Sequence, residues 1–213
     1  MVKVQKFIFN PFQVNTYIVY DNTGECIIID PACNGEAESD AMKTFINDKG
    51  LKPILHLNTH CHFDHVVGIP FVKDTWHTAS GAHEKEMDIL EHAPIMGSLY
   101  GFELEHIPII EHKIKHNESI RIGNSELIAL LVPGHSPGSL SFYSKDGGFV
   151  IAGDALFEGS IGRTDLPGGD YDTLIESIQN HLFTLPDETL IYPGHGNSST
   201  IENEKKLNPF FNT

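Results

Sequence analysis

The stretch 59–65, Thr-His-Cys-His-Phe-Asp-His, constrains the fold of this chain more than any other feature. It contains four potential metal ligands within six residues, in the order H-x-H-x-D-H, directly after the apolar run 53–58. Such a run predicts a buried strand. The ligands therefore lie where a strand ends and a loop begins, a place where a rigid sheet supports functional side chains.

The spacing within this stretch indicates two neighbouring metal positions. His60 and His62 are two residues apart, so an extended backbone points both imidazoles the same way. Asp64 and His65 follow as the chain turns, and they face a second point nearby. A polar loop with unrelated histidines is the alternative, and we disfavour it because matching ligands recur downstream.

Three further candidate ligands each follow an apolar run and a glycine-containing turn: His135, Asp154 and His195. Glycine permits the tight turns and close backbone approach that such positions need. Each residue alone is equally typical of an ordinary turn. Together with the first cluster they make five histidines and two aspartates, which predicts a complete two-metal site with ions ~3.5–4 Å apart.

The rest of the chain alternates between strand-like and helix-like segments. Strands are predicted at 7–9, 16–20, 26–29, 53–58, 126–132, 139–143, 148–152 and 189–192, and helices at 36–49 and 171–185. A short helix is expected from residue 66, a further helical turn or two within 81–93, and a loop at the rim of a pocket over 94–105. Two strand-rich portions with helices between and after them indicate two sheets packed face to face with helices outside.

Charge and composition exclude some classes of function. The formal charge of −15 argues against general binding to nucleic acid or to anionic membranes. No apolar run approaches the ~20 residues of a membrane span, and the N-terminal segment does not resemble a signal peptide. Three sparse cysteines do not form a disulfide framework. We therefore expect a cytoplasmic protein, whose oligomeric state the sequence leaves open.

Several single residues allow two interpretations each. Asp30 is either a turn former or a carboxylate that orients a ligand histidine. Cys61 is expected to be a small filler within the ligand loop, and His83 and His92 are expected to be surface or hydrogen-bonded histidines. Arg163 is either a partner for a substrate carboxylate or one half of a structural ion pair with an acidic neighbour such as Asp165.

The motifs T-H-C-H-F-D-H, P-G-H-S-P-G-S, G-D-A-L-F and P-G-H-G resemble those of the metallo-β-lactamase superfamily, from Asp30 to Pro209. The resemblance implies an α+β fold, an αββα sandwich with two mixed sheets and a metal site at one edge. It also implies the ligand assignment. The first metal would be bound by His60, His62 and His135, the second by Asp64, His65 and His195, and both by the bridging Asp154. Asp30 matches the structural aspartate beneath the site.

The segments 153–170, 192–196, 202–204 and 208–210 resemble the glyoxalase II branch, in particular its short bacterial members. The resemblance implies a single domain over 1–213 without the C-terminal helical region that helps to bind glutathione. It implies hydrolysis of small S-acylglutathione thioesters such as S-lactoylglutathione, with weak preference for glutathione over other thiols. Lactam-hydrolysing relatives commonly have a different residue at Asp154, and flavodiiron relatives need an acidic residue at His62.

Two competing functions remain at this point. The first is an iron-dependent persulfide dioxygenase, a family that has a similar Gly-Arg-Thr-Asp segment, here 162–165. That family uses a single iron held by two histidines and an aspartate. The Pro-Gly-His motif at His195 supplies a ligand for a second metal and so favours the hydrolase. A non-catalytic metal-binding protein is disfavoured by the intact ligand set. Zinc is the first expectation for the two divalent ions, and iron and manganese also suit these ligands. Asp64 is also the candidate catalytic residue, because it is placed to orient a metal-bound hydroxide.

Overall fold

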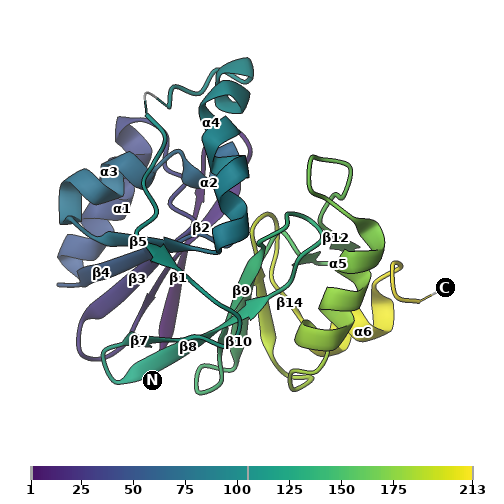
Figure 1. Cartoon of the computed structure of the whole chain (residues 1–213). Coiled ribbons are helices and arrows are strands. Elements are labelled where there is room, and N and C mark those ends of the chain that lie inside the picture. Colours follow the sequence, from purple (N-terminus) through teal and green to yellow (C-terminus); the bar gives the residue numbers. More distant parts are fainter. Residues whose placement is uncertain (1, 105, 213) are drawn as a thin grey trace.

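Two six-stranded sheets lie face to face in the computed structural model, which describes residues 2–104 and 106–212 (Figure 1). The first sheet has the strand order β1 (Lys3–Phe9), β2 (Val14–Tyr20), β3 (Glu25–Ile29), β4 (Lys52–Leu57), β5 (Ala79–Ala82) and β6 (His112–Lys113). The second has the order β14 (Ser199–Thr200), β13 (Leu190–Pro193), β10 (Phe149–Gly153), β9 (Leu140–Ser144), β8 (Ser125–Leu131) and β7 (Ser119–Ile122). Both sheets are mixed, because β3 to β6 and the pair β10–β13 are parallel.

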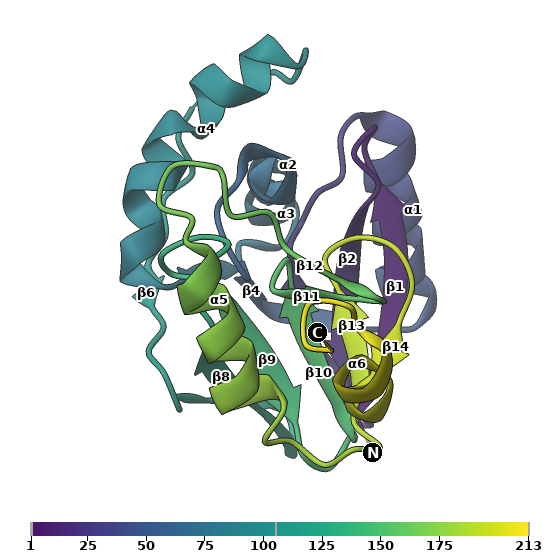
Figure 2. The same cartoon turned by 90° about the vertical axis from the view of Figure 1, so that its right-hand side faces the viewer.

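Helices cover the outer faces of both sheets. The first sheet carries α1 (Glu36–Asp48), α2 (Phe63–Val66), α3 (Ile69–Trp76), the short η1 (Glu84–Glu86) and α4 (Met87–Leu99). The second carries α5 (Tyr171–Ser177), which continues as η2 (Ile178–Leu182), and α6 (Ile201–Leu207). A small hairpin of β11 (Leu156–Phe157) and β12 (Ser160–Ile161) lies beside it. Figure 2 shows α5 and α6 in front of the second sheet, so the expected αββα sandwich is confirmed.

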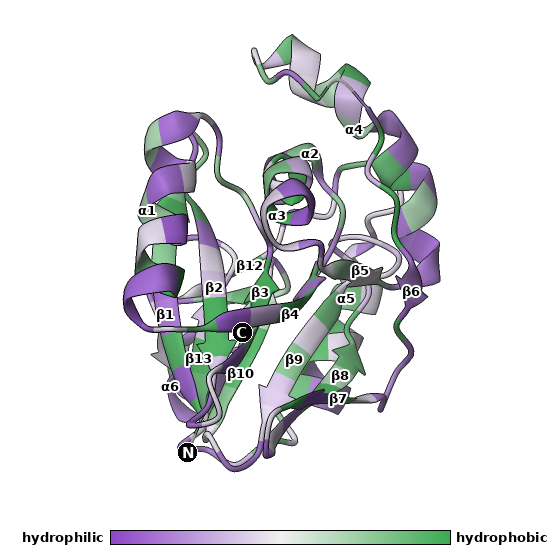
Figure 3. Cartoon of the chain, turned by 90° about the vertical axis from the view of Figure 1, so that its left-hand side faces the viewer, coloured by the Kyte–Doolittle hydropathy of each residue, from purple (hydrophilic) through white to green (hydrophobic). Residues whose placement is uncertain are grey.

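Strand periodicity explains the three apolar layers. In β2, Tyr17 and Val19 point into the core between the sheets, whereas Ile18 points outward to the layer beneath α1 and α3. In β10, Ile151 joins the central core and Val150 joins the layer beneath α5. Successive side chains of a strand alternate between faces, so strands that are apolar on both faces must be covered on both sides. Figure 3 shows the resulting apolar colouring of the strands and the polar outer side of α1.

The segment around Pro94 differs from the prediction. We expected a loop over 94–105, but α4 runs from Met87 to Leu99 with Pro94 inside it. Burial of Leu90, Ala93 and Gly97 on one side of α4 outweighs the helix-breaking effect of proline. Residues 100–104 are irregular as expected, and Glu105 lies outside the described residues.

The segment after α3 also differs in part. The expected helical turns within 81–93 are found from residue 84, but Gly81 and Ala82 belong to β5. A Cβ at Gly81 would approach Leu57 Cδ2 at 2.8 Å, so a larger residue here would displace the Leu57 side chain from its close packing between β4 and β5. Pattern alone could not identify this strand, because its four residues are small and lack the alternation of a longer strand. Among the described residues, no helix is long and apolar enough to cross a membrane.

Candidate metal centre

Four strand ends bring the predicted ligands to one edge of the sandwich. His60, His62, Asp64 and His65 follow β4 of the first sheet and continue into α2. In the second sheet, the other three follow β8, β10 and β13: His135, Asp154 and His195. Because β10 and β13 are parallel, their carboxyl ends meet at the same edge. The two sheets therefore contribute donors to one place, although the residues are up to 135 positions apart in the chain.

His60, His62 and His135 form the first donor group. Their ligand atoms lie within 4.8 Å of one another. His135 Nε2 is 3.0 Å from His62 Nδ1 and 3.3 Å from His60 Nε2. The opposite ring nitrogens have other partners: His135 Nδ1 donates to the Arg163 carbonyl at 2.8 Å, and His60 Nδ1 lies 3.1 Å from Thr59 Oγ1. Such outer contacts fix the tautomer and point the free nitrogen toward a metal.

Asp64, His65 and His195 form the second donor group. His65 Nε2 is 3.2 Å from His195 Nε2, and Asp64 Oδ2 lies 3.8 Å and 3.7 Å from these two nitrogens. His195 Nδ1 donates to the carbonyl of Phe12 at 3.0 Å. A side chain at Gly194 would meet Asp154 Oδ1 at 2.0 Å, so the backbone beside His195 can approach the carboxylate only as glycine.

Asp154 lies between the two groups. Its Oδ2 is 3.8 Å from His135 Nε2 and 3.4 Å from His195 Nε2, and its Oδ1 is 3.7 Å from His65 Nε2. Oδ1 is buried, and no hydrogen-bond partner for it exists among the described residues. A buried carboxylate oxygen without a partner is costly unless it binds a cation. The donor set therefore fits divalent metal, with this carboxylate facing both positions.

Asp30 supports the second group from beneath. Its buried carboxylate accepts hydrogen bonds from the Thr59 amide and hydroxyl, both at 2.7 Å, and lies 3.2 Å from His65 Nδ1. Both carboxylate oxygens of Asp30 thus have partners, although the candidate ligand atoms of Asp30, His60 and His65 also lie within 4.8 Å of one another. Of the two roles left open by the sequence, the contacts match the carboxylate that orients a ligand histidine.

Burial and charge separate the histidines into two classes. Burial lowers the pKa of His60 and His135, and lowers the pKa of His62 to about 3, which leaves neutral rings with free lone pairs for a metal. Burial also opposes a charge on His65, but the carboxylates of Asp154 and Asp64 outweigh it and raise the pKa to about 10. This part of the centre therefore favours positive charge, as a metal position should.

The family model of the metallo-β-lactamase superfamily matches residues 9–195. The chain belongs to the metallo-β-lactamase superfamily. The probable metallo-hydrolase YqgX of Bacillus subtilis (strain 168) is 39% identical over 213 residues, covering 99% of this chain and 98% of the relative. The hydroxyacylglutathione hydrolase GloC of Haemophilus influenzae is 35% identical over 213 residues, covering 95% and 94%.

Solved structures of other superfamily members have the same fold. The B3 metallo-β-lactamase BLEG-1 gives a TM-score of 0.89 at 35% identity, covering all of both chains. TTHA1623, solved in a di-iron-bound form, gives 0.86 at 33% identity, covering 97% of this chain and all of the other. ETHE1 from Myxococcus xanthus gives 0.79 at 25% identity, covering 97% and 83%.

Four aromatic rings lie beside the candidate metal centre of this superfamily member. Phe63, between the candidate ligands His62 and Asp64, stacks on Tyr100 with ring centroids 5.3 Å apart. Phe12 meets Phe63 at 5.2 Å and Tyr100 at 5.4 Å, and Phe102 completes this aromatic cluster. Tyr100 is 57% exposed, so the cluster offers an open aromatic surface. Local sequence patterns do not predict this cluster, because residues far apart in the chain form it.

The other residues singled out in the sequence have contacts that indicate structural roles. Cys61 is buried among Val66 and other apolar residues, and burial raises the pKa of its thiol, in agreement with a small filler. His83 caps η1 by accepting from the Lys85 amide. Arg163 forms a two-pronged ion pair with Asp165 at 2.7 and 2.8 Å, the structural alternative foreseen for it.

Proposed function

We propose that this chain is a metal-dependent thioester hydrolase that acts on S-acylglutathione compounds such as S-lactoylglutathione. The observation that carries the proposal is the convergence of two three-residue donor groups on the buried Asp154, whose Oδ1 has no hydrogen-bond partner among the described residues. Similarity to GloC over 95% of the chain supports the choice of thioester substrate. Water and thioester give a carboxylic acid and a free thiol, so the reaction needs no other reactant.

The proposed assignment of the residues follows the two donor groups. The first ion would be held by His60, His62 and His135, the second by Asp64, His65 and His195, and Asp154 would contact both. We propose zinc for both positions, and the di-iron-bound form of TTHA1623 makes iron the first alternative. When bound, such a pair lowers the pKa of a water from ~15.7 toward ~7 and polarises a carbonyl oxygen.

The protein's own groups then position the reactants. Asp64 lies in the second donor group with its side chain 12% exposed, so one carboxylate oxygen can accept a hydrogen bond from the attacking water and orient it. Asp30 holds His65, and the Phe12 carbonyl holds His195, so both Nε2 atoms stay directed inward. Pre-oriented groups of this kind reduce the entropy that the reaction would otherwise lose.

The aromatic cluster of Phe12, Phe63, Tyr100 and Phe102 is the surface on which we place the part of the substrate beyond the reacting carbonyl. Its exposed face is apolar, whereas the carboxylates of glutathione need cations. The Arg163 guanidinium near the centre is already paired with Asp165. We therefore expect weak discrimination between glutathione and other thiols, since remote contacts decide specificity.

The proposed cellular setting is cytoplasmic, with no nucleic-acid or membrane partner. A net charge of −15 and three buried cysteines with free thiols support this setting.

A substrate panel tests the proposed activity. Zinc-loaded and iron-loaded protein would be assayed with S-lactoylglutathione, with the same acyl group on N-acetylcysteamine, and with a chromogenic cephalosporin. We expect hydrolysis of both thioesters, with kcat/KM values within about tenfold of each other, and at least a hundredfold slower lactam hydrolysis. Loss of all thioester activity in a protein that retains its metals would refute the proposal.

Persulfide dioxygenase is the second candidate, because of the similarity to ETHE1 from Myxococcus xanthus and the segment 162–165. His195 argues against it, since its Nε2 is directed at His65 and Asp154 and would complete a second metal position. Oxygen consumption by the iron-loaded protein with glutathione persulfide would reverse our ranking.

A further inference from the structure

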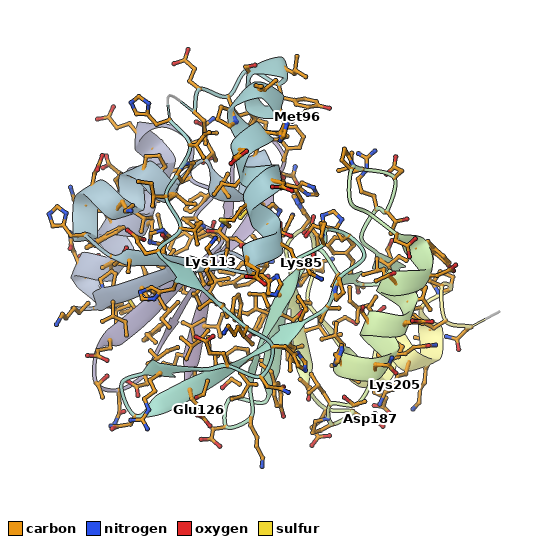
Figure 4. All side chains as sticks on the ribbon, in the orientation of Figure 1. Lys85, Met96, Lys113, Glu126, Asp187 and Lys205 are labelled. Carbon is orange, nitrogen blue, oxygen red and sulfur yellow. The ribbon has the colours of Figure 1, made fainter. Side chains whose placement is uncertain are left out.

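Glu86, at the end of η1, is a fully buried carboxylate outside both donor groups. Its Oε2 accepts the Cys61 amide hydrogen at 2.8 Å. Its Oε1 accepts the Ser136 hydroxyl and the Gly138 amide, both at 2.7 Å. Figure 4 labels Lys85, its neighbour in the chain, at the base of α4. Three donors from two separate loops thus converge on one side chain.

The two loops are those that carry the first donor group. Cys61 stands between His60 and His62, and Ser136 directly follows His135. One loop leaves β4 of the first sheet and the other leaves β8 of the second. The carboxylate of Glu86 therefore links the two sheets at the point where their histidines must meet.

The chemistry of these contacts requires a carboxylate. An ionised carboxyl group only accepts hydrogen bonds, and all three partners donate. Glutamine at this position would direct an NH₂ group at one of the donors. Burial raises the pKa of Glu86, and the three hydrogen bonds counteract this effect by favouring the ionised form.

Gly138 shows how closely the second loop approaches Glu86. A Cβ at this position would lie 2.9 Å from both Glu86 Cγ and Glu86 Oε1, and 3.0 Å from His83 Nδ1. A side chain at position 138 would therefore force either the loop after His135 or the Glu86 side chain to shift. Gly138→Ala would disturb the hydrogen bonds between Glu86 and the loop after His135 by altering the loop, without changing the charge of Glu86.

We propose that Glu86 is a positioning residue that sets the distance between the loops of His60, His62 and His135, and so selectively holds the first metal position in shape. This inference rests on the proposed metal site but not on the identity of the substrate. Loss of an outer hydrogen-bond partner typically weakens metal binding about 10- to 100-fold. The loss should be confined to the first donor group, because the second is held by Asp30 and the Phe12 carbonyl.

The test is a zinc titration of apoprotein followed through the histidine-ring NMR signals. In Glu86→Gln, we expect the signals of His60, His62 and His135 to need about 10- to 100-fold more free zinc than in the wild type. The signals of His65 and His195 should respond as before. Gly138→Ala should reproduce this selective loss. Should Glu86→Gln fail to fold, Gly138→Ala and Ser136→Ala carry the test.

Asp21→Asn is the matched control. The Asp21 carboxylate is also buried and accepts from the Thr23 and Asn124 amides, but it joins the β2–β3 and β7–β8 turns. These turns lie at the opposite ends of the strands from the metal centre, so stability should fall without a change in zinc affinity. Equal loss at both donor groups in Glu86→Gln, or no loss at either, overturns the inference. Selective zinc loss in a protein without thioester activity refutes only the proposed function.

Discussion

At the scale of single residues, Asp154 connects the two donor groups, because its carboxylate oxygens face His135, His65 and His195. Asp154→Ala should therefore lower the affinity for both ions. The loss should be at least the ~10- to 100-fold that is typical when a hydrogen-bond partner of a metal ligand is removed. Asp154→Asn keeps the shape but loses the charge, so it should weaken both positions less severely. Metal content after dialysis against a chelator measures the effect. Normal metal content and rate in Asp154→Ala would exclude a bridging role.

Exposed Asp187 supplies the control for this experiment. It pairs with Lys205 at 2.6 Å on the far side of the second sheet, where Figure 4 labels both residues. Asp187→Ala removes one carboxylate without touching the centre. Its metal content should equal that of the wild type.

The convergence of the seven candidate ligands at one place was predictable because metal chemistry restricts both the residue types and their spacing. His60 and His62 needed only the two-residue period of an extended chain. The roles of Glu86 and the Phe12 carbonyl were not predictable, since one is an acid outside any recognisable motif and the other is a backbone atom. Their roles arise from contacts across 25 and 183 positions of the chain, which no local pattern contains.

At the scale of elements, Glu111 connects the segment before β6 with α3 and β5. Its carboxylate lies 2.5 Å from Lys73 Nζ and accepts the Ser80 amide at 2.7 Å. Slight burial works against the charge, but the Lys73 and Ser80 hydrogen bonds outweigh it and lower the pKa of Glu111 to about 2. The carboxylate is thus more favourable in the folded state than in the unfolded chain, where the pKa is ~4.3.

The pH dependence follows from this difference. Glu111 contributes stability above pH ~4.3, and the contribution disappears as the pH falls toward 2. Glu111→Gln should therefore lower the urea midpoint at pH 7, and the difference from the wild type should shrink between pH 5 and pH 3. A difference that stays constant over this range would show that shape, not charge, carries the contribution.

Tyr100, just beyond the end of α4, is the most exposed ring of the aromatic cluster. Aromatic pairs contribute about 0.5–1.5 kcal/mol beyond the area that they bury. Tyr100→Ala should therefore raise KM about 2- to 12-fold for a thioester with an aromatic acyl group, with kcat nearly unchanged. The lactoyl thioester, which has no aromatic group, should be much less affected.

Leu207→Ala is the control for the aromatic surface. Leu207 is 72% exposed on α6, on the outer side of the second sheet. Truncation of this side chain should leave the KM values for the aromatic and the lactoyl thioester unchanged. Equal KM changes for aromatic and lactoyl thioesters in Tyr100→Ala would indicate a general disturbance of the centre. Tyr100 can be located in Figure 4 from the exposed Met96, which is labelled on α4 one helical turn before Tyr100.

For the whole molecule, the long apolar runs were sufficient to predict a two-sheet sandwich. Strands β2, β3, β8 and β10 are apolar on both faces and must be covered on both sides. The short strands β5, β6, β11, β12 and β14 have two to four residues each, too few to show a period. They form because a neighbouring strand offers backbone hydrogen bonds. Their own sequences therefore do not predict them.

Metal binding should stabilise the molecule as a whole, because its donors come from both sheets and are assembled only in the folded chain. An ion at 100 times its Kd adds about 2.7 kcal/mol, which corresponds to about 5–10 °C in Tm for a chain of this size. Calorimetry of zinc-loaded and chelator-treated protein measures the shift. Asp154→Ala should lose most of it, because the Asp154 carboxylate faces both donor groups. Equal Tm values with and without metal at pH 7.5 would mean that the donors do not bind an ion in the folded state.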